Sequence, residues 1–104
     1  MAEEKKVVER SKADENTIFI GPKAFMNYVT GVVMQFTTKG AKEMSIKARG
    51  KFITRAVDVS EVSTKKFLKE QGVTVKDIKI DSEQFKNNEG RDINVSTIEI
   101  VLGK

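Results

Sequence analysis

The spacing of apolar residues changes several times along the chain, and the order of these changes is the strongest constraint on its fold. Residues 17–20 form a short β-branched and aromatic run that stops at Gly21-Pro22, which predicts a buried strand followed by a turn. From Lys23 to Lys39 the apolar residues recur every three or four positions. This spacing predicts an amphipathic helix with Pro22 near its start and Gly40 at its C-terminal cap.

A different period follows this helix. Apolar and polar residues alternate over residues 44–49, which is the period of a half-buried strand. Side chains two positions apart in a strand project from the same face. The pattern therefore predicts that Lys47 and Arg49 lie together on one face of a sheet.

The last half of the chain predicts one more helix and a hairpin. After Gly50 the helical spacing returns over residues 53–67, and two extended segments, about 73–85 and 93–102, then flank turn residues at 87–90. The resulting order is βαβαββ. We expect an α/β two-layer sandwich, with two helices on one face of a four-stranded mixed sheet and a projecting C-terminal β-hairpin.

The domain organisation follows from where burial is possible. Residues 1–16 hold only Val7 and Val8 as large apolar groups among alternating charges, which is too little burial to offset the entropy of ordering them. We expect a disordered N-terminal tail over residues 1–16 and one domain over residues 17–104, a length at which a single modest core forms.

Composition excludes most catalytic and metal chemistry. The 104 residues include no Cys and no His, so zinc fingers, disulfides, thiol nucleophiles and imidazole bases are ruled out. We expect no enzyme activity, no metal and no cofactor. The rival hypothesis from another class is a small enzyme or ligand module that uses Ser63 and Lys66, which fit a Ser-x-x-Lys pattern without its companion motifs.

Two further patterns bear on location. The longest apolar runs fall short of the roughly 18 residues that a membrane helix needs, and the first 16 residues lack the apolar stretch of a signal peptide. We therefore expect a cytoplasmic protein with no membrane partner.

The positive charge is concentrated in one stretch. The chain carries a net charge of +4, and residues 39–55 alone contribute +5, from six cations against Glu43. A solvated charged face is the simpler interpretation of a basic run. Here, however, the run surrounds Gly50 at a predicted change from strand to helix, which favours a binding loop.

Such a junction suits phosphate groups. Lys47, Arg49 and Lys51 would lie near the free N–H groups and the positive end of the dipole of the following helix. The junction sequence holds no Asn or Gln to read bases and shows no aromatic platform. We expect contacts with a nucleic-acid backbone rather than with its sequence.

Four segments resemble the Alba family of archaeal chromatin and nucleic-acid-binding proteins. They are IFIGPKAFMNYV, IKARGKFITRAVDV, KFL at 66–68, and GRDINVSTIEI, and they occur on the element order given above. The resemblance implies a non-enzymatic homodimer that binds double-stranded DNA, RNA or both and contributes to chromosome organisation. It also implies two hairpin arms that follow the minor groove, and a chromosome-associated location.

The resemblance also implies roles for individual residues. Phe67 corresponds to an aromatic residue at contacts between dimers, which would allow higher assemblies on nucleic acid. The implied nucleic-acid contacts are Lys23, Lys47, Arg49, Lys51, Arg55 and Arg91.

The chain departs from the family pattern in ways that support an alternative function. Many members have two consecutive lysines after the first glycine, one of them an acetylation target, and here the first of the pair is Pro22, so acetylation control at that position cannot operate. Asn94 stands where the hairpin often has another basic residue, and the C-terminal tail is Gly103-Lys104 and not a basic cluster. The last two changes imply weaker binding. They favour a specialised RNA-binding or regulatory DNA-binding protein of low abundance over a bulk chromatin coat.

Overall fold

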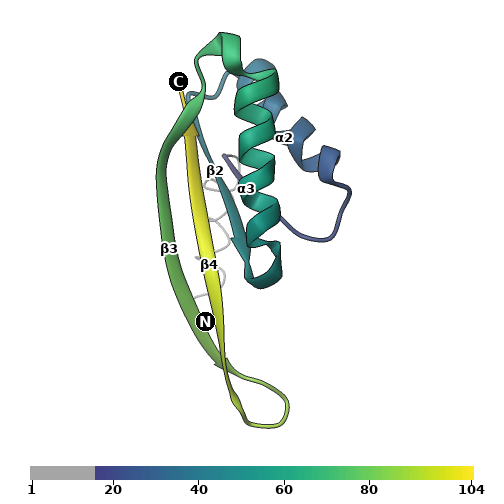
Figure 1. Cartoon of the computed structure of the whole chain (residues 1–104), viewed down its shortest axis with the longest axis vertical. Coiled ribbons are helices and arrows are strands. Elements are labelled where there is room, and N and C mark those ends of the chain that lie inside the picture. Colours follow the sequence, from purple (N-terminus) through teal and green to yellow (C-terminus); the bar gives the residue numbers. More distant parts are fainter. Residues whose placement is uncertain (1–15) are drawn as a thin grey trace.

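The chain forms a two-layer sandwich in the computed structural model, which describes residues 16–104 (Figure 1). The first layer is a sheet of four strands and the second holds two helices. In chain order the main elements are β1 (Thr17–Phe19), α2 (Phe25–Thr37), β2 (Glu43–Arg49), α3 (Ile53–Val62), β3 (Thr74–Lys86) and β4 (Asp92–Gly103). Short helical turns η1 (Gly50–Phe52), η2 (Ser63–Phe67) and η3 (Lys69–Gln71) flank α3.

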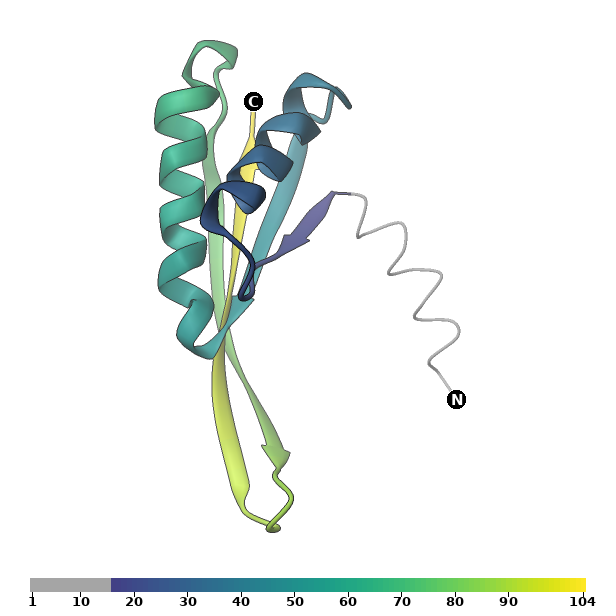
Figure 2. The same ribbon diagram turned by 90° about the vertical axis from the view of Figure 1, so that its right-hand side faces the viewer.

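The sheet has the strand order β1-β2-β4-β3. β1 and β2 are parallel, because α2 carries the chain back between them, whereas β4 is antiparallel to both of its neighbours. Both helices cover the same face of the sheet, and the other face is left without a helix among residues 16–104 (Figure 2). The predicted sandwich, mixed sheet and projecting hairpin are therefore confirmed.

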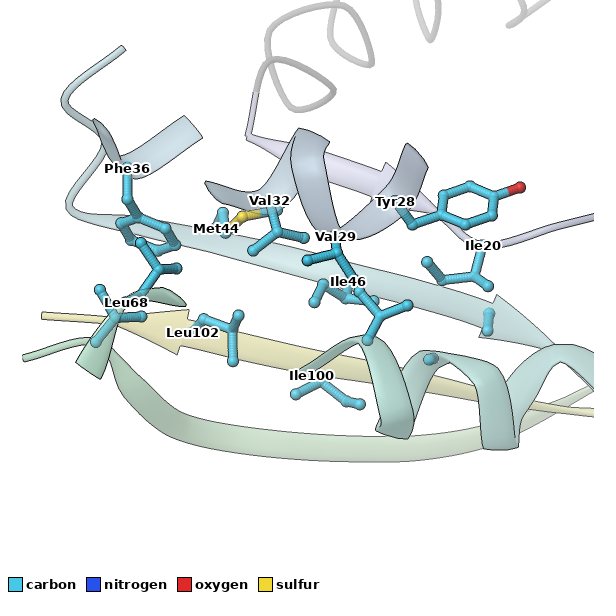
Figure 3. Close-up of a cluster of buried hydrophobic side chains, with 14 residues drawn as sticks. Ile20, Tyr28, Val29, Val32, Phe36, Met44, Ile46, Leu68, Ile100 and Leu102 are labelled. Carbon is cyan, nitrogen blue, oxygen red and sulfur yellow. The ribbon is translucent and has the colours of Figure 1, made fainter. Parts of the chain in front are cut away.

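The core lies between the two layers. Val29, Val32 and Phe36 from α2 pack onto Met44 and Ile46 of β2, and residues of α3, β4 and the segment after α3 complete the cluster (Figure 3). The alternation predicted for residues 44–49 is confirmed, since every second side chain of β2 is buried. This burial fixes which residues of β2 must face away from the helices.

The loop before α2 differs from the prediction. Pro22 lies outside the helix, which begins at Phe25. The backbone N–H groups of Gly21 and Lys23 both donate to the hydroxyl of Tyr28, at 2.9 and 3.1 Å. Because this buried hydroxyl accepts the two amides on either side of Pro22, the segment forms a turn and not the first turn of a helix.

The helical stripe predicted over residues 53–67 is buried only in part. α3 continues into η2, whose Ser63 is fully buried, whereas Val57 is 41% and Phe67 50% exposed. Val59 and Ala56 face the sheet as expected. Val57 and Phe67 therefore belong to the surface of the monomer.

β3 forms the outer edge of the sheet and the first arm of a long hairpin. All 13 of its residues are exposed, because neither helix lies over it (Figure 1). A register shift between Val75 and Asp77 marks a bulge, and such bulges increase the local twist of a strand. The far part of the hairpin extends beyond the sandwich (Figure 1).

The predicted N-terminal tail lies outside the described residues, except for Asn16. The carbonyl of Asn16 accepts the N–H of Ser45 at 2.8 Å. The described chain therefore joins the sheet one residue before β1.

Candidate nucleic-acid interface

The turn between β2 and α3 reverses the chain within a few residues. Gly50 has φ of +56°, in the left-handed region, and an added Cβ would find its nearest neighbour, Val95 Cγ1, at an ordinary 3.7 Å. Glycine is therefore required by the backbone conformation and not by lack of space. The reversal places the end of β2 next to the start of α3, as the sequence predicted.

Ile46, which precedes Lys47, and Ala48, which lies between Lys47 and Arg49, are both buried against the helices. Lys47 and Arg49 therefore project from the opposite face of the sheet, which no helix covers. Their predicted common face is confirmed by the register, in which Lys47 pairs with Glu99 and Arg49 with Thr97. The Lys47 Nζ lies 5.9 Å from the ring centroid of Phe19. The junction therefore does carry an aromatic ring, contrary to the sequence-based expectation.

Arg49 is partly neutralised by an acidic residue of the hairpin. Its Nη2 lies 2.8 Å from Glu83 Oε1, with both side chains more than half exposed. Exposed pairs of this kind stabilise a protein by about 0.2–1 kcal/mol, so a phosphate group can compete for the guanidinium. Sequence reasoning missed this pair because the partners are 34 positions apart and meet only through the register of β3.

Lys51 lies on η1 at the start of α3. It is exposed, and its Nζ lies 5.5 Å from the ring centroid of Phe52. Within residues 16–104, the first turn of α3 has no acidic residue and no side chain caps it. The free N–H groups at this helix end therefore attract an anion, as the Lys51 ammonium does.

Arg55 and Lys23 are brought together although 32 positions separate them. The Arg55 Nη1 donates a hydrogen bond to the carbonyl of Lys23. This bond joins the first turn of α3 to the loop before α2, so that both cationic residues lie at the same end of the helix layer.

Arg91 is held apart from the other predicted contacts, at the tip of the hairpin. Asn87 Oδ1 accepts the N–H groups of Glu89 and Arg91, at 2.9 and 3.0 Å, and Gly90 has φ of +81°. The turn is thereby defined by side-chain and backbone bonds. The hairpin leaves the sandwich at the end where β2 meets α3 (Figure 1), so Arg91 lies beyond that end of the sandwich.

The basic run of residues 39–55 is divided by the fold. Lys39 and Lys42 precede β2, whereas Arg49 is its last residue and Lys51 follows it. The seven-residue strand separates the two groups by about 23 Å. Only the second group lies with Lys23 and Arg55. We call the set Lys23, Lys47, Arg49, Lys51 and Arg55 the basic end.

The family model described as Alba matches residues 16–82, which is more than half of the chain. The chain belongs to the Alba family.

Relatives within the Alba family match nearly their whole length. The DNA/RNA-binding protein Alba of Methanothrix thermoacetophila is 54% identical over 92 residues, covering 88% of this chain and 99% of the relative. The protein of the same name from Methanococcus maripaludis is 47% identical over 90 residues, covering 86% and 99%. The structure of Alba from Thermoplasma volcanium superposes with a TM-score of 0.77 at 44% identity, covering 86% of this chain and all of that one.

Two other features predicted for this Alba chain, the contact residue Phe67 and the pair Ser63 and Lys66, lie beyond the C-terminal end of α3. Phe67 is half exposed there, so it is available for contacts between molecules. Ser63 is fully buried and its hydroxyl has no hydrogen-bond partner among the described residues, whereas Lys66 is exposed. The Ser63 hydroxyl therefore cannot reach a substrate in this fold.

Residues 16–104 contain no group of three acidic, His or Cys side chains that could hold a metal ion. No helix in that part of the Alba fold is long and apolar enough to cross a membrane.

Proposed function

We propose that the chain binds double-stranded DNA, RNA or both through backbone phosphates, largely without regard to sequence, and contributes to chromosome organisation in the cytoplasm. The observation that carries the proposal is the basic end. Lys47, Arg49 and Lys51 lie on the last part of β2 and on η1, and Arg55 bonds to the Lys23 carbonyl, at the end of the sandwich where the hairpin leaves it. Relatives named DNA/RNA-binding protein Alba support it. Cations on a rigid body next to a long arm suit a duplex, whose phosphates run in extended rows.

The chemistry of the basic end favours contacts with the backbone. Its side chains are lysines and arginines without an exposed Asn or Gln beside them on β2 or α3. In the hairpin turn, Asn87 already uses its side-chain oxygen on backbone N–H groups. Phosphate contacts position a protein on a duplex but carry no sequence information.

We further propose that the binding unit is a homodimer formed through the edge of β3. Ile78 and Ile80 of β3 lie on the face of the sheet that the helices occupy, where they pair with Ile100 and Ile98 of β4. Ile78 is nevertheless 56% and Ile80 78% exposed. A hollow of about 510 Å³ separates this edge from α3, with Val75 and Glu61 in its lining. Val57 of α3 lies one turn before Glu61 and is also exposed.

A second copy is the occupant that suits this edge. An exposed apolar strand edge is a liability for a monomer. Two-fold symmetry would cover the same residues on both subunits and would present two basic ends and two hairpins to one duplex.

The alternative function, a specialised RNA or regulatory DNA binder of low abundance, is favoured by the ion pairs of the hairpin. Glu83 pairs with Arg49, and Asp92 pairs with Lys86 at 2.9 Å. Each carboxylate lowers the positive charge that a phosphate would meet. Crosslinking in cells, followed by sequencing of both nucleic acids, separates the two: broad genomic coverage supports chromosome organisation, and a few sites or mainly transcripts support the alternative.

Replacing Lys51 with Ala should weaken binding to two duplexes of unrelated sequence by the same factor, because a phosphate contact reads no base. Fluorescence anisotropy with labelled duplexes measures both affinities. Lys39→Ala is the matched control, since Lys39 belongs to the same basic run but lies at the other end of β2, and it should bind as the unaltered chain does. A Lys51→Ala loss confined to one duplex would contradict the proposal.

Phe67 is proposed as a contact between dimers. Phe67→Ala should leave the dimer intact and shorten the clusters of protein on long DNA, because the side chain is half exposed and lies at the far end of the α3–η2 helix from the basic end. Electron microscopy of protein on DNA measures cluster length, and sedimentation measures the dimer. Clusters of unchanged length would remove Phe67 from any assembly role.

A further inference from the structure

An exposed aromatic side chain lies beside the basic end without a role in the core. Ile18 in β1 and Ile20 directly after it pack toward the helices, so the extended chain must turn Phe19 to the opposite face. Phe19 is 56% exposed there. A large apolar ring left open on a sheet contributes little to burial, and its position next to cationic residues points to a binding role.

The surroundings of Phe19 are built from the phosphate-binding residues proposed above. Phe19 pairs in register with Lys47, whose Nζ lies over the ring at 5.9 Å from its centroid. Arg49 lies two positions further along β2 on the same face. Phe19, Lys47 and Arg49 together line a hollow of about 910 Å³, a volume typical of sites for small organic groups.

We propose that Phe19 is a stacking platform for an unpaired nucleobase, with Lys47 and Arg49 binding the phosphates on either side of it. This inference rests on the proposed function and names a second substrate class for it, single-stranded nucleic acid. In a duplex, each base is stacked on both faces and offers only its edges in the grooves. A ring lying on a sheet can therefore stack only on a base that has left the helix.

The charges on the open face of the sheet indicate where a bound nucleic-acid strand would lie. Lys47 and Arg49 lie on β2, next to Phe19. On the same face, Glu99 of β4 pairs in register with Lys47, and β3 presents Asp81 and Glu83 together with Lys79. On β3 the carboxylates of Asp81 and Glu83 outnumber Lys79 and repel phosphates, so the nucleic-acid backbone is expected to follow β1 and β2 and not β3. Glu99 is in addition occupied by Ser45 Oγ, which donates to it at 2.9 Å.

Stacking on a platform of this kind is tolerant of sequence, since every base has an aromatic face. The proposed site therefore adds a preference for unpaired nucleotides without adding a preference for particular bases. Loops, bulges and strand ends in RNA, and melted DNA, are the substrates that present such nucleotides.

The test uses the full chain and two probes: a ten-nucleotide thymidine strand carrying one 2-aminopurine, and a 20-base-pair DNA duplex. Phe19→Ala should weaken binding to the single strand about 5- to 150-fold, the range for loss of one stacked base, and change duplex affinity less than two-fold. Binding of the unaltered chain should quench the 2-aminopurine fluorescence, and Phe19→Ala should abolish that quenching.

Two further variants separate stacking from simple apolar contact. Phe19→Tyr keeps the flat ring and should retain single-strand affinity and quenching, whereas Phe19→Leu keeps apolar volume without the ring and should behave as Phe19→Ala. A Phe19→Leu variant that quenches as the unaltered chain does would overturn the proposal. So would a Phe19→Ala variant that loses single-strand and duplex binding equally, or one that sediments as a monomer, because Phe19 would then belong to a protein interface.

Failure of this inference and failure of the proposed function give different results. If the unaltered chain binds neither probe, the proposed function is wrong. If it binds the duplex in a manner that depends on Lys51, and Phe19→Ala leaves single-strand binding unchanged, only the stacking platform is wrong.

Discussion

Binding of the chain to duplex DNA should weaken about 500-fold when the salt concentration rises from 50 to 200 mM. If about five phosphates are neutralised by the dimer, the logarithm of affinity should fall against the logarithm of salt concentration with a slope of roughly −4.5, because condensed counterions are released on binding. The basic end supplies the cations for these contacts. Titrations by anisotropy at four salt concentrations measure the slope.

Single substitutions should change that slope by different amounts. Lys51→Ala, present twice in a dimer, should reduce it by up to about 2 units. Arg49→Ala should reduce the slope by less. Arg49 must leave Glu83 to reach a phosphate, and the freed carboxylate then attracts a salt cation, which offsets part of the counterion release. Lys39→Ala should leave the slope unchanged. A slope near zero for the unaltered chain would remove the electrostatic mechanism.

Replacing Ile80 with Asp should convert the proposed dimer into a monomer and weaken duplex binding by 100-fold or more. Ile80 is 78% exposed, so the substitution costs the monomer fold little. In a symmetric interface it places two buried carboxylates in apolar surroundings, which is strongly unfavourable. A monomer holds one basic end, and loss of the linked second contact removes an avidity of about 10² to 10⁴.

Sedimentation measures the oligomeric state, and circular dichroism verifies that the variant is folded. Met26→Asp is the matched control, because Met26 is 49% exposed in the first turn of α2, where a carboxylate suits the helix dipole. It should sediment as the unaltered chain does. A dimer that survives Ile80→Asp would place the interface elsewhere on the molecule.

The architecture and the face of the key cations were predictable from the sequence because they depend on local periodicity. Alternation over residues 44–49 requires Lys47 and Arg49 to share a face, whatever the rest of the chain does. The separation of Lys39 from Lys51 could have been derived in the same way, since an extended strand lies between them.

The other features of the site depend on contacts between distant segments. Residues 17–20 are too short a run to reveal that Phe19 faces outward, because each residue of the run is apolar or β-branched. The Arg49–Glu83 pair requires the register of β3, which the bulge between Val75 and Asp77 shifts. The bond from Arg55 to the Lys23 carbonyl forms only when α3 packs beside the loop before α2.

The helix formed by α3 and η2 has Arg55 near its first turn and Phe67 at its last residue. They are twelve positions apart, or about 18 Å along the axis of an α-helix. At such distances the free-energy effects of two substitutions usually add. The affinity of one molecule for its substrate and the association of neighbouring molecules can therefore vary independently in evolution, with the rigid helix holding the two surfaces at a constant spacing.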